Sequence, residues 1–140
     1  MVKIRYTNEL MGVMSLFNKI TRVSAKDCFE DKLGLLTFVV DQVLIGKAVG
    51  KKATNVKKLE QLLKRKLRII GYTSEVKQFL RNVIYPLKVS SIEQADEVLT
   101  IKDDDKKTKS LLIGRNAQNL RNTESIVNRY FSHITEIKVE

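Results

Sequence analysis

Residues 49–56 read VGKKATNV, and residues 113–120 read IGRNAQNL. The two stretches lie 64 positions apart and share Gly, Ala and Asn at equivalent places, with a basic residue directly after the glycine. The match continues without a gap, so that Glu60 aligns with Glu124 and Arg65 aligns with Arg129. A gapless internal repeat of this kind predicts two copies of one small structural unit.

Each stretch predicts a tight loop that begins with glycine and leads into a second helix. Glycine lets the backbone turn sharply and approach a ligand closely. The N-terminus of the second helix offers unpaired N–H groups and the positive end of its dipole, which suit a phosphate. A purely structural corner is the alternative for either loop alone, and the repetition favours nucleic-acid contact. A competing register from Gly46 to Gly50 exists, and the repeat favours the start at Gly50.

The apolar spacing predicts alternating helices and strands on both sides of each loop. We expect helices over residues 7–21, 42–49, 54–66, 74–84, 107–113 and 118–130. We expect strands over residues 25–30, 35–40, 67–72, 87–92, 97–101 and 134–139. Pro86, the only proline, stops the fourth helix and marks the expected boundary between two domains, residues 1–86 and residues 87–140.

The composition indicates a small basic protein with an aliphatic core. Hydrophobic residues make up 43% of the 140 residues, aromatic residues make up 6%, and Trp is absent. The net charge is +10, which predicts attraction to polyanions. Residues 1–86 hold 17 Lys and Arg and 7 Asp and Glu, a balance of +10, whereas residues 87–140 hold nine of each. The first half therefore carries the whole excess.

Several classes of protein are disfavoured. The single cysteine, Cys28, excludes an intrachain disulfide and a multi-cysteine zinc site. No apolar run approaches the roughly 20 residues of a membrane span, and the charged N-terminus does not resemble a secretory signal. We expect a soluble cytoplasmic protein.

His133 stands without a second catalytic partner, and Asp103–Asp105 is more typical of a solvated turn than of a cation site. We expect no enzyme activity, no metal and no cofactor.

Residues 45–60 and 112–120 resemble the two KH (K homology) modules of the NusA family of transcription termination and antitermination factors, most closely its short archaeal form. The resemblance covers nearly the whole chain. It implies an α+β fold made of tandem bacterial-type (type II) KH domains, in which a GXXG loop clamps about four nucleotides of single-stranded RNA. No Gly/Ser-rich or Pro-rich linker separates the halves, so we expect the two modules to pack as one rigid unit, as a monomer.

The resemblance also implies which residues contact RNA. They lie in the two loops and in the first turns of the helices that follow: Gly50, Lys51, Lys52, Ala53, Asn55, Lys57, Lys58, Gly114, Arg115, Asn116, Ala117, Asn119 and Arg121. RNA polymerase is a second candidate partner. Four neighbouring apolar residues suit either the bases of the RNA or the protein core: Val49, Val56, Ile113 and Leu120. The basic run from Lys47 to Arg68 is interpreted as partly RNA contact and partly a solvated helix face.

One departure from the family pattern concerns the closing position of each loop, which is Ala53 or Ala117 in place of glycine. Alanine adopts right-handed helical angles readily, so we expect each alanine to begin the following helix. A ribosome-associated or RNA-processing KH protein fits the same residues. A degenerate KH scaffold that binds proteins instead of RNA fits the two alanines and the neutral second half.

Overall fold

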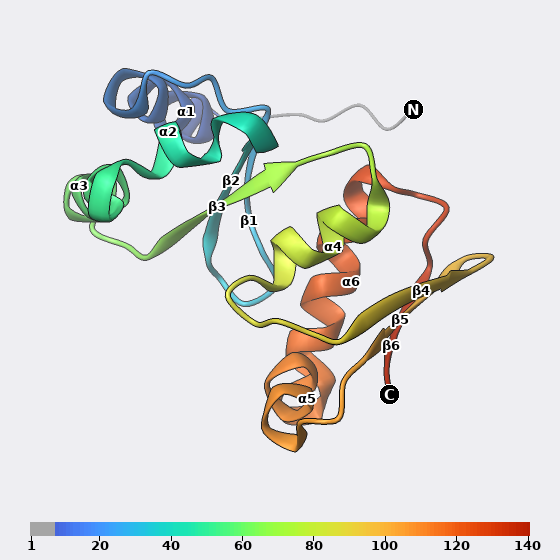
Figure 1. Cartoon of the computed structure of the whole chain (residues 1–140). Coiled ribbons are helices and arrows are strands. Elements are labelled where there is room, and N and C mark those ends of the chain that lie inside the picture. Colours follow the sequence, from blue (N-terminus) through green and yellow to red (C-terminus); the bar gives the residue numbers. More distant parts are fainter. Residues whose placement is uncertain (1–7) are drawn as a thin grey trace. The chain divides into compact units, whose positions relative to one another are not determined.

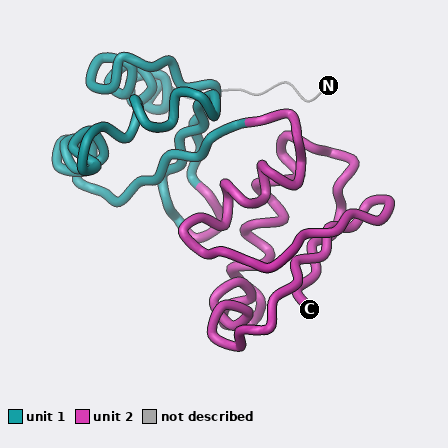
Figure 2. Tube along the Cα trace, viewed as in Figure 1, with its two compact units in different colours: residues 1–30, 34–72 teal, residues 31–33, 73–140 magenta. Residues whose placement is uncertain are grey.

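The computed structural model describes residues 8–140, and they divide into two compact units. Unit 1 comprises residues 1–30 and 34–72, and unit 2 comprises residues 31–33 and 73–140 (Figure 2). Each unit has a mixed α+β fold with one three-stranded sheet and its own helices (Figure 1). Within residues 8–140, no helix is long and apolar enough to cross a membrane.

The expected elements of the first half are present, with shifted ends. Unit 1 contains α1 (Asn8–Thr21), β1 (Asp27–Glu30), β2 (Leu36–Asp41), the 3-10 turn η1 (Gln42–Leu44), α2 (Ile45–Val49), η2 (Lys51–Ala53), α3 (Thr54–Leu63) and β3 (Leu67–Tyr72). Thr7, which was expected to open the first helix, lies outside the described residues. Helix α3 ends three residues before the expected end because Lys64 adopts a left-handed conformation, with φ of 55°.

Unit 2 repeats the same order of elements. It contains α4 (Val76–Ile84), β4 (Ser91–Ala95), β5 (Val98–Lys102), α5 (Lys106–Ile113), η3 (Arg115–Ala117), α6 (Gln118–Tyr130) and β6 (Glu136–Val139). In both units the first strand pairs antiparallel with the second, and the second pairs parallel with the third. The internal repeat in the sequence is therefore a repeat of topology, consistent with two KH-like domains in tandem.

The compact units divide after Tyr72, 14 residues before the boundary expected at residue 86. Helix α4 belongs to unit 2 because its buried side chains pack on α6: the ring of Phe79 lies 5.4 Å from the ring of Tyr130 and 5.5 Å from that of Phe131. In the order of elements, α4 takes the place in unit 2 that α1 takes in unit 1. The proline ends a helix, as expected, but that helix opens the second unit instead of closing the first.

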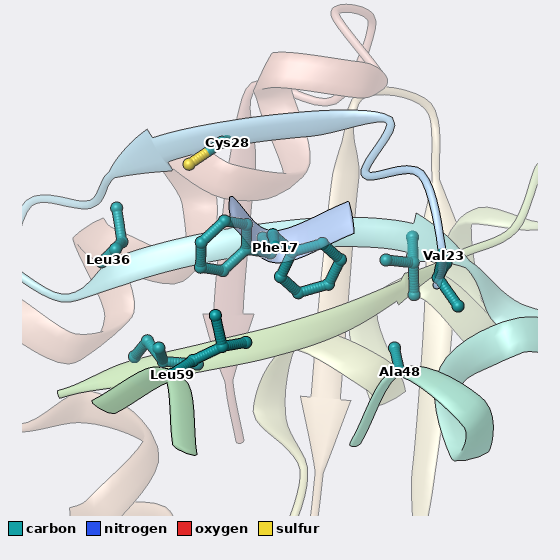
Figure 3. Close-up of a cluster of buried hydrophobic side chains, with 9 residues drawn as sticks. Phe17, Val23, Cys28, Leu36, Ala48 and Leu59 are labelled. Carbon is teal, nitrogen blue, oxygen red and sulfur yellow. The ribbon is translucent and has the colours of Figure 1, made fainter. Parts of the chain in front are cut away.

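The core of unit 1 joins all three of its helices to one face of the sheet (Figure 3). Leu36, Phe38 and Val40 alternate along β2, so their side chains point to the same face. Phe17 of α1 stacks on Phe38 with ring centroids 4.3 Å apart. Ala48 of α2 and Leu59 of α3 are fully buried in the same cluster. This packing anchors both helices that flank the first loop.

Candidate nucleic-acid interface

The two glycine loops have the same backbone conformation. Gly50 has φ of 81° and ψ of 164°, and Gly114 has φ of 73° and ψ of 177°. This region of conformational space is essentially restricted to glycine. The third residue of each loop, Lys52 or Asn116, is left-handed with φ of 55°. The repeat in sequence therefore encodes one loop geometry twice.

The closing alanines do not begin the following helices in right-handed conformation, and that expectation is wrong. Ala53 has φ of 59° and Ala117 has φ of 60°, so both are left-handed caps that precede α3 and α6. An L-residue is disfavoured there, whereas glycine is not. The left-handed backbone angle is thus the physical reason for a glycine at this position. The alanines adopt the same angle with backbone strain.

The first turns of α3 and α6 have no side-chain cap at their N-caps, since the capping residues are alanines. Inside each loop, the amide of the closing alanine donates to the glycine carbonyl, at 3.1 Å in unit 1 and 3.2 Å in unit 2. Thr54 adds a hydroxyl hydrogen bond to the carbonyl of Lys51. The loops are thus held internally, and the helix N-termini behind them suit an anion.

Asn55 and Asn119 are turned toward the preceding helix. The side-chain amide of Asn55 donates to the carbonyl of Lys47 at 3.2 Å, and that of Asn119 donates to the carbonyl of Leu111 at 2.9 Å. Both residues are half-buried. The resemblance to KH modules implied that the two asparagines contact RNA. A carboxamide can also donate to a main-chain carbonyl, and both asparagines do so here.

The structure places the predicted site residues in two groups. The charged and polar tips are exposed: Lys51, Lys52, Lys57, Lys58, Arg115, Asn116 and Arg121. The residues that shape the loops are half-buried: Gly50, Ala53, Asn55, Gly114, Ala117 and Asn119. Among the apolar neighbours, Val56 packs against the unit 1 core and Leu120 is 9% exposed. Core packing therefore accounts for both of these side chains.

In the second unit, the predicted RNA contact Arg121 is paired with a carboxylate of the same helix. Arg121 forms an ion pair with Glu124 at 2.6 Å, and this hydrogen bond raises the pKa of Arg121. Glu124 also accepts the amide of Ile137 at 2.8 Å, just as Glu60 accepts the amide of Leu67 at 3.2 Å in unit 1. The repeated glutamate thus ties the second helix of each unit to the strand that follows it.

A further repeated pair was missed from the sequence. Asp41 accepts the amide of Val43 at 3.1 Å, and Asp105 accepts the amide of Thr108 at 3.1 Å, so each caps the segment that leads into its loop. The two aspartates lie 64 positions apart, which is the spacing of the glycines. Extending the repeat toward the N-terminus would have identified them.

Asp103 and Asp105 of the acidic turn accept hydrogen bonds that hold the local backbone, and His133 packs against an aromatic ring. Asp105 caps α5, and hydrogen bonds from Thr108 lower the pKa of Asp105. Asp103 accepts from the amides of Ser90 and Asp105. The ring of His133 lies edge-on to Phe131 at 6.3 Å. In the part of the chain that the structure describes, no group of three or more His, Cys, Asp and Glu could hold a metal ion.

Comparison with known proteins identifies archaeal proteins that are similar to nearly the whole chain. The chain is 29% identical over 143 aligned positions to the probable transcription termination protein NusA of Methanocaldococcus jannaschii, covering 99% of this chain and 76% of that protein. It is 22% identical to the protein of the same name from Thermoplasma acidophilum, covering 94% and 93%. The chain is similar to archaeal NusA along nearly its whole length. This confirms the resemblance that the two loops indicated.

Two further comparisons concern the same chain. The Methanococcus vannielii protein of the same name is 31% identical over 91 residues, and the match spans 52% of that protein. The crystal structure of APE1850 superposes with a TM-score of 0.74 at 22% identity, covering 96% of this chain and 100% of that one, which supports the fold. No protein-family model matches the chain.

The net charge of the chain differs strongly between the two units. Unit 1 holds 14 Lys and Arg and 5 Asp and Glu, a net of +9, whereas unit 2 holds 12 and 11, a net of +1. Four of the exposed lysines of unit 1 lie in the loop and the first turns of α3: Lys51, Lys52, Lys57 and Lys58. The same loop geometry therefore occurs once in a unit with a net charge of +9 and once in a unit with a net charge of +1.

Proposed function

We propose that this chain binds single-stranded RNA without catalysing a reaction, through two bacterial-type (type II) KH modules that act in transcription termination or antitermination. The observation that carries the proposal is the double occurrence of one loop, with glycine, two exposed polar residues and an uncapped helix N-terminus in the same conformation. Phosphates of the RNA backbone would lie at each loop, which is how KH modules hold about four nucleotides.

The distribution of charge supports different contributions of the two modules to RNA binding. The four exposed lysines beside Gly50 would neutralise phosphates and provide most of the affinity, since such contacts release counterions from the nucleic acid. The second loop presents Arg115 and Asn116, and Arg121 is paired with Glu124. The second module would therefore add contacts that depend less on salt, and two linked sites gain through effective concentration.

The role in transcription rests on the relatives, which are named probable transcription termination proteins. RNA polymerase is accordingly the proposed protein partner. A ribosomal or RNA-processing role would use the same two loops, and co-purification separates these possibilities. Recovery of the tagged chain with RNA polymerase subunits supports the proposal, whereas recovery with ribosomal proteins alone would move the function to the ribosome.

RNA binding itself is tested by filter binding with a random single-stranded RNA pool, with a duplex RNA of the same length as the control. We expect retention of the single strand at near-physiological salt and weaker retention of the duplex, because the bases of a duplex are not accessible. Failure to retain single-stranded RNA, with the fold intact by circular dichroism, would favour a scaffold that binds proteins.

A further inference from the structure

The asparagine that follows each loop contacts the loop glycine directly. A Cβ built on Gly114 would lie 2.5 Å from Cγ and 2.6 Å from Nδ2 of Asn119, and a Cβ built on Gly50 would lie 3.0 Å from the same atoms of Asn55. The carboxamide thus occupies the space that a side chain at the glycine would need. Glycine and asparagine form a matched pair in both units.

The same carboxamide completes the end of the preceding helix. The last carbonyls of a helix have no partner within the helix. Gly50 donates its amide to Gly46, and Gly114 donates its amide to Ser110. The next carbonyls, those of Lys47 and Leu111, receive the side-chain amides of Asn55 and Asn119 across eight residues. One side chain therefore joins the first helix, the glycine and the second helix.

We infer that Asn55 and Asn119 are positioning residues that hold the loop backbone in its RNA-binding shape and do not themselves contact RNA. This inference rests on the proposed RNA-binding function. Its physical basis is that each carboxamide donates a hydrogen bond to a helix carbonyl and that both asparagines are half-buried. The exposed side chains at the loops belong to other residues: Lys51, Lys52, Arg115 and Asn116. Removing the carboxamide should release the loop and misalign those tips.

The two roles predict different results for Asn55→Ala in the full chain. A neutral RNA contact would lower affinity and leave the dependence on salt unchanged. A positioning residue would lower affinity and also flatten the plot of log affinity against log salt, because Lys51 and Lys52 would no longer be aligned with phosphates. We expect a loss of about threefold to tenfold in affinity, the equivalent of one hydrogen bond, together with a flatter slope.

A second readout does not require RNA. In the RNA-free protein, the NMR amide signals of residues 51–53 should shift in Asn55→Ala, and their hydrogen exchange should become faster. The corresponding signals of residues 115–117 should respond to Asn119→Ala. Gln118→Ala is the matched control, because it removes a carboxamide that is exposed and adjacent to Asn119; it should leave the loop signals unchanged.

Asn55→Ser serves if the alanine variant does not fold, since serine suits a first helical turn but is too short to reach Lys47. Weaker RNA binding with unchanged loop signals and an unchanged salt slope would overturn the inference in favour of direct contact. Unchanged loop signals and affinity together would also overturn it. If the parent chain binds no RNA while the loop signals still shift, the proposed function fails but the structural role of the asparagines stands.

Discussion

Ala53 and Ala117 have the same left-handed conformation, with φ of 59° and 60°, at the closing position of the two loops. For an L-residue this conformation costs about 1–2 kcal/mol, and glycine adopts it freely. The two alanines therefore leave backbone strain in each unit, which a glycine at the same position would relieve.

Ala53→Gly and Ala117→Gly should each stabilise the protein by about 0.5–1 kcal/mol, because relief of the left-handed strain exceeds the greater entropy of glycine in the unfolded chain. RNA affinity should be retained or improved. Urea unfolding provides the measurement. Ala48→Gly is the control, because Ala48 is buried inside α2 and its replacement should destabilise the protein. Destabilisation by both loop variants would contradict the role assigned to the backbone angle.

Replacing Lys51 and Lys52 with alanine together should weaken binding to all RNA sequences and reduce the steepness of the salt dependence. Each lost phosphate contact on a single strand changes the slope by about 0.7. Lys64→Ala with Lys66→Ala removes the same charge beyond the far end of α3, where both side chains are exposed. An equal change of slope in both double variants would show that only the net charge of unit 1 matters.

Glu124→Gln should increase RNA binding at the second loop by about twofold to fivefold, the range expected when an exposed ion pair worth up to about 1 kcal/mol is removed. Arg121 would be released, while the glutamine oxygen could still accept the amide of Ile137. The affinity of a short RNA, measured by fluorescence anisotropy, provides the check. A decrease in affinity would indicate that Glu124 is needed to orient Arg121.

RNA length tests whether the two modules share one strand. If each module holds about four nucleotides, an RNA of about ten should bind much more tightly than one of about five. Arg115→Ala with Asn116→Ala should remove most of this gain. Gly114→Asp is the harsher variant, since its Cβ would lie 2.5 Å from Asn119 at a positive φ. Undiminished length dependence in the double variant would exclude the second loop as an RNA site.

Acid should weaken the cap of α5. Hydrogen bonds from Thr108 lower the pKa of Asp105 in the folded state, so its stabilising effect is fully present above the unfolded pKa of about 3.9 and is lost as the pH falls through the folded value. Asp105→Ala should lower the melting temperature at pH 7, and the difference from the parent should shrink below about pH 4. A difference that stays constant down to pH 2 would show that the ionised carboxylate is not what stabilises the helix.

Much of the architecture was predictable from local patterns. The bounds of β3 and α6 are those that the apolar spacing predicts, and the 64-residue repeat predicts two units with the same order of elements. The boundary predicted at Pro86 does not coincide with the division between the compact units, which falls after Tyr72. A proline shows where a helix stops, but the side chains of Tyr130 and Phe131, far along the chain, decide which unit α4 joins.

The sequence by itself determined the two loops, because a glycine, a following helix and a basic residue interact over a few positions and the repetition makes their pattern recognisable. Only the tertiary structure decided which protein groups the polar side chains around the loops contact. A carboxamide or a guanidinium suits RNA and protein partners equally, so Asn55, Asn119 and Arg121 could not be assigned until the fold brought Lys47, Leu111 and Glu124 within hydrogen-bonding distance.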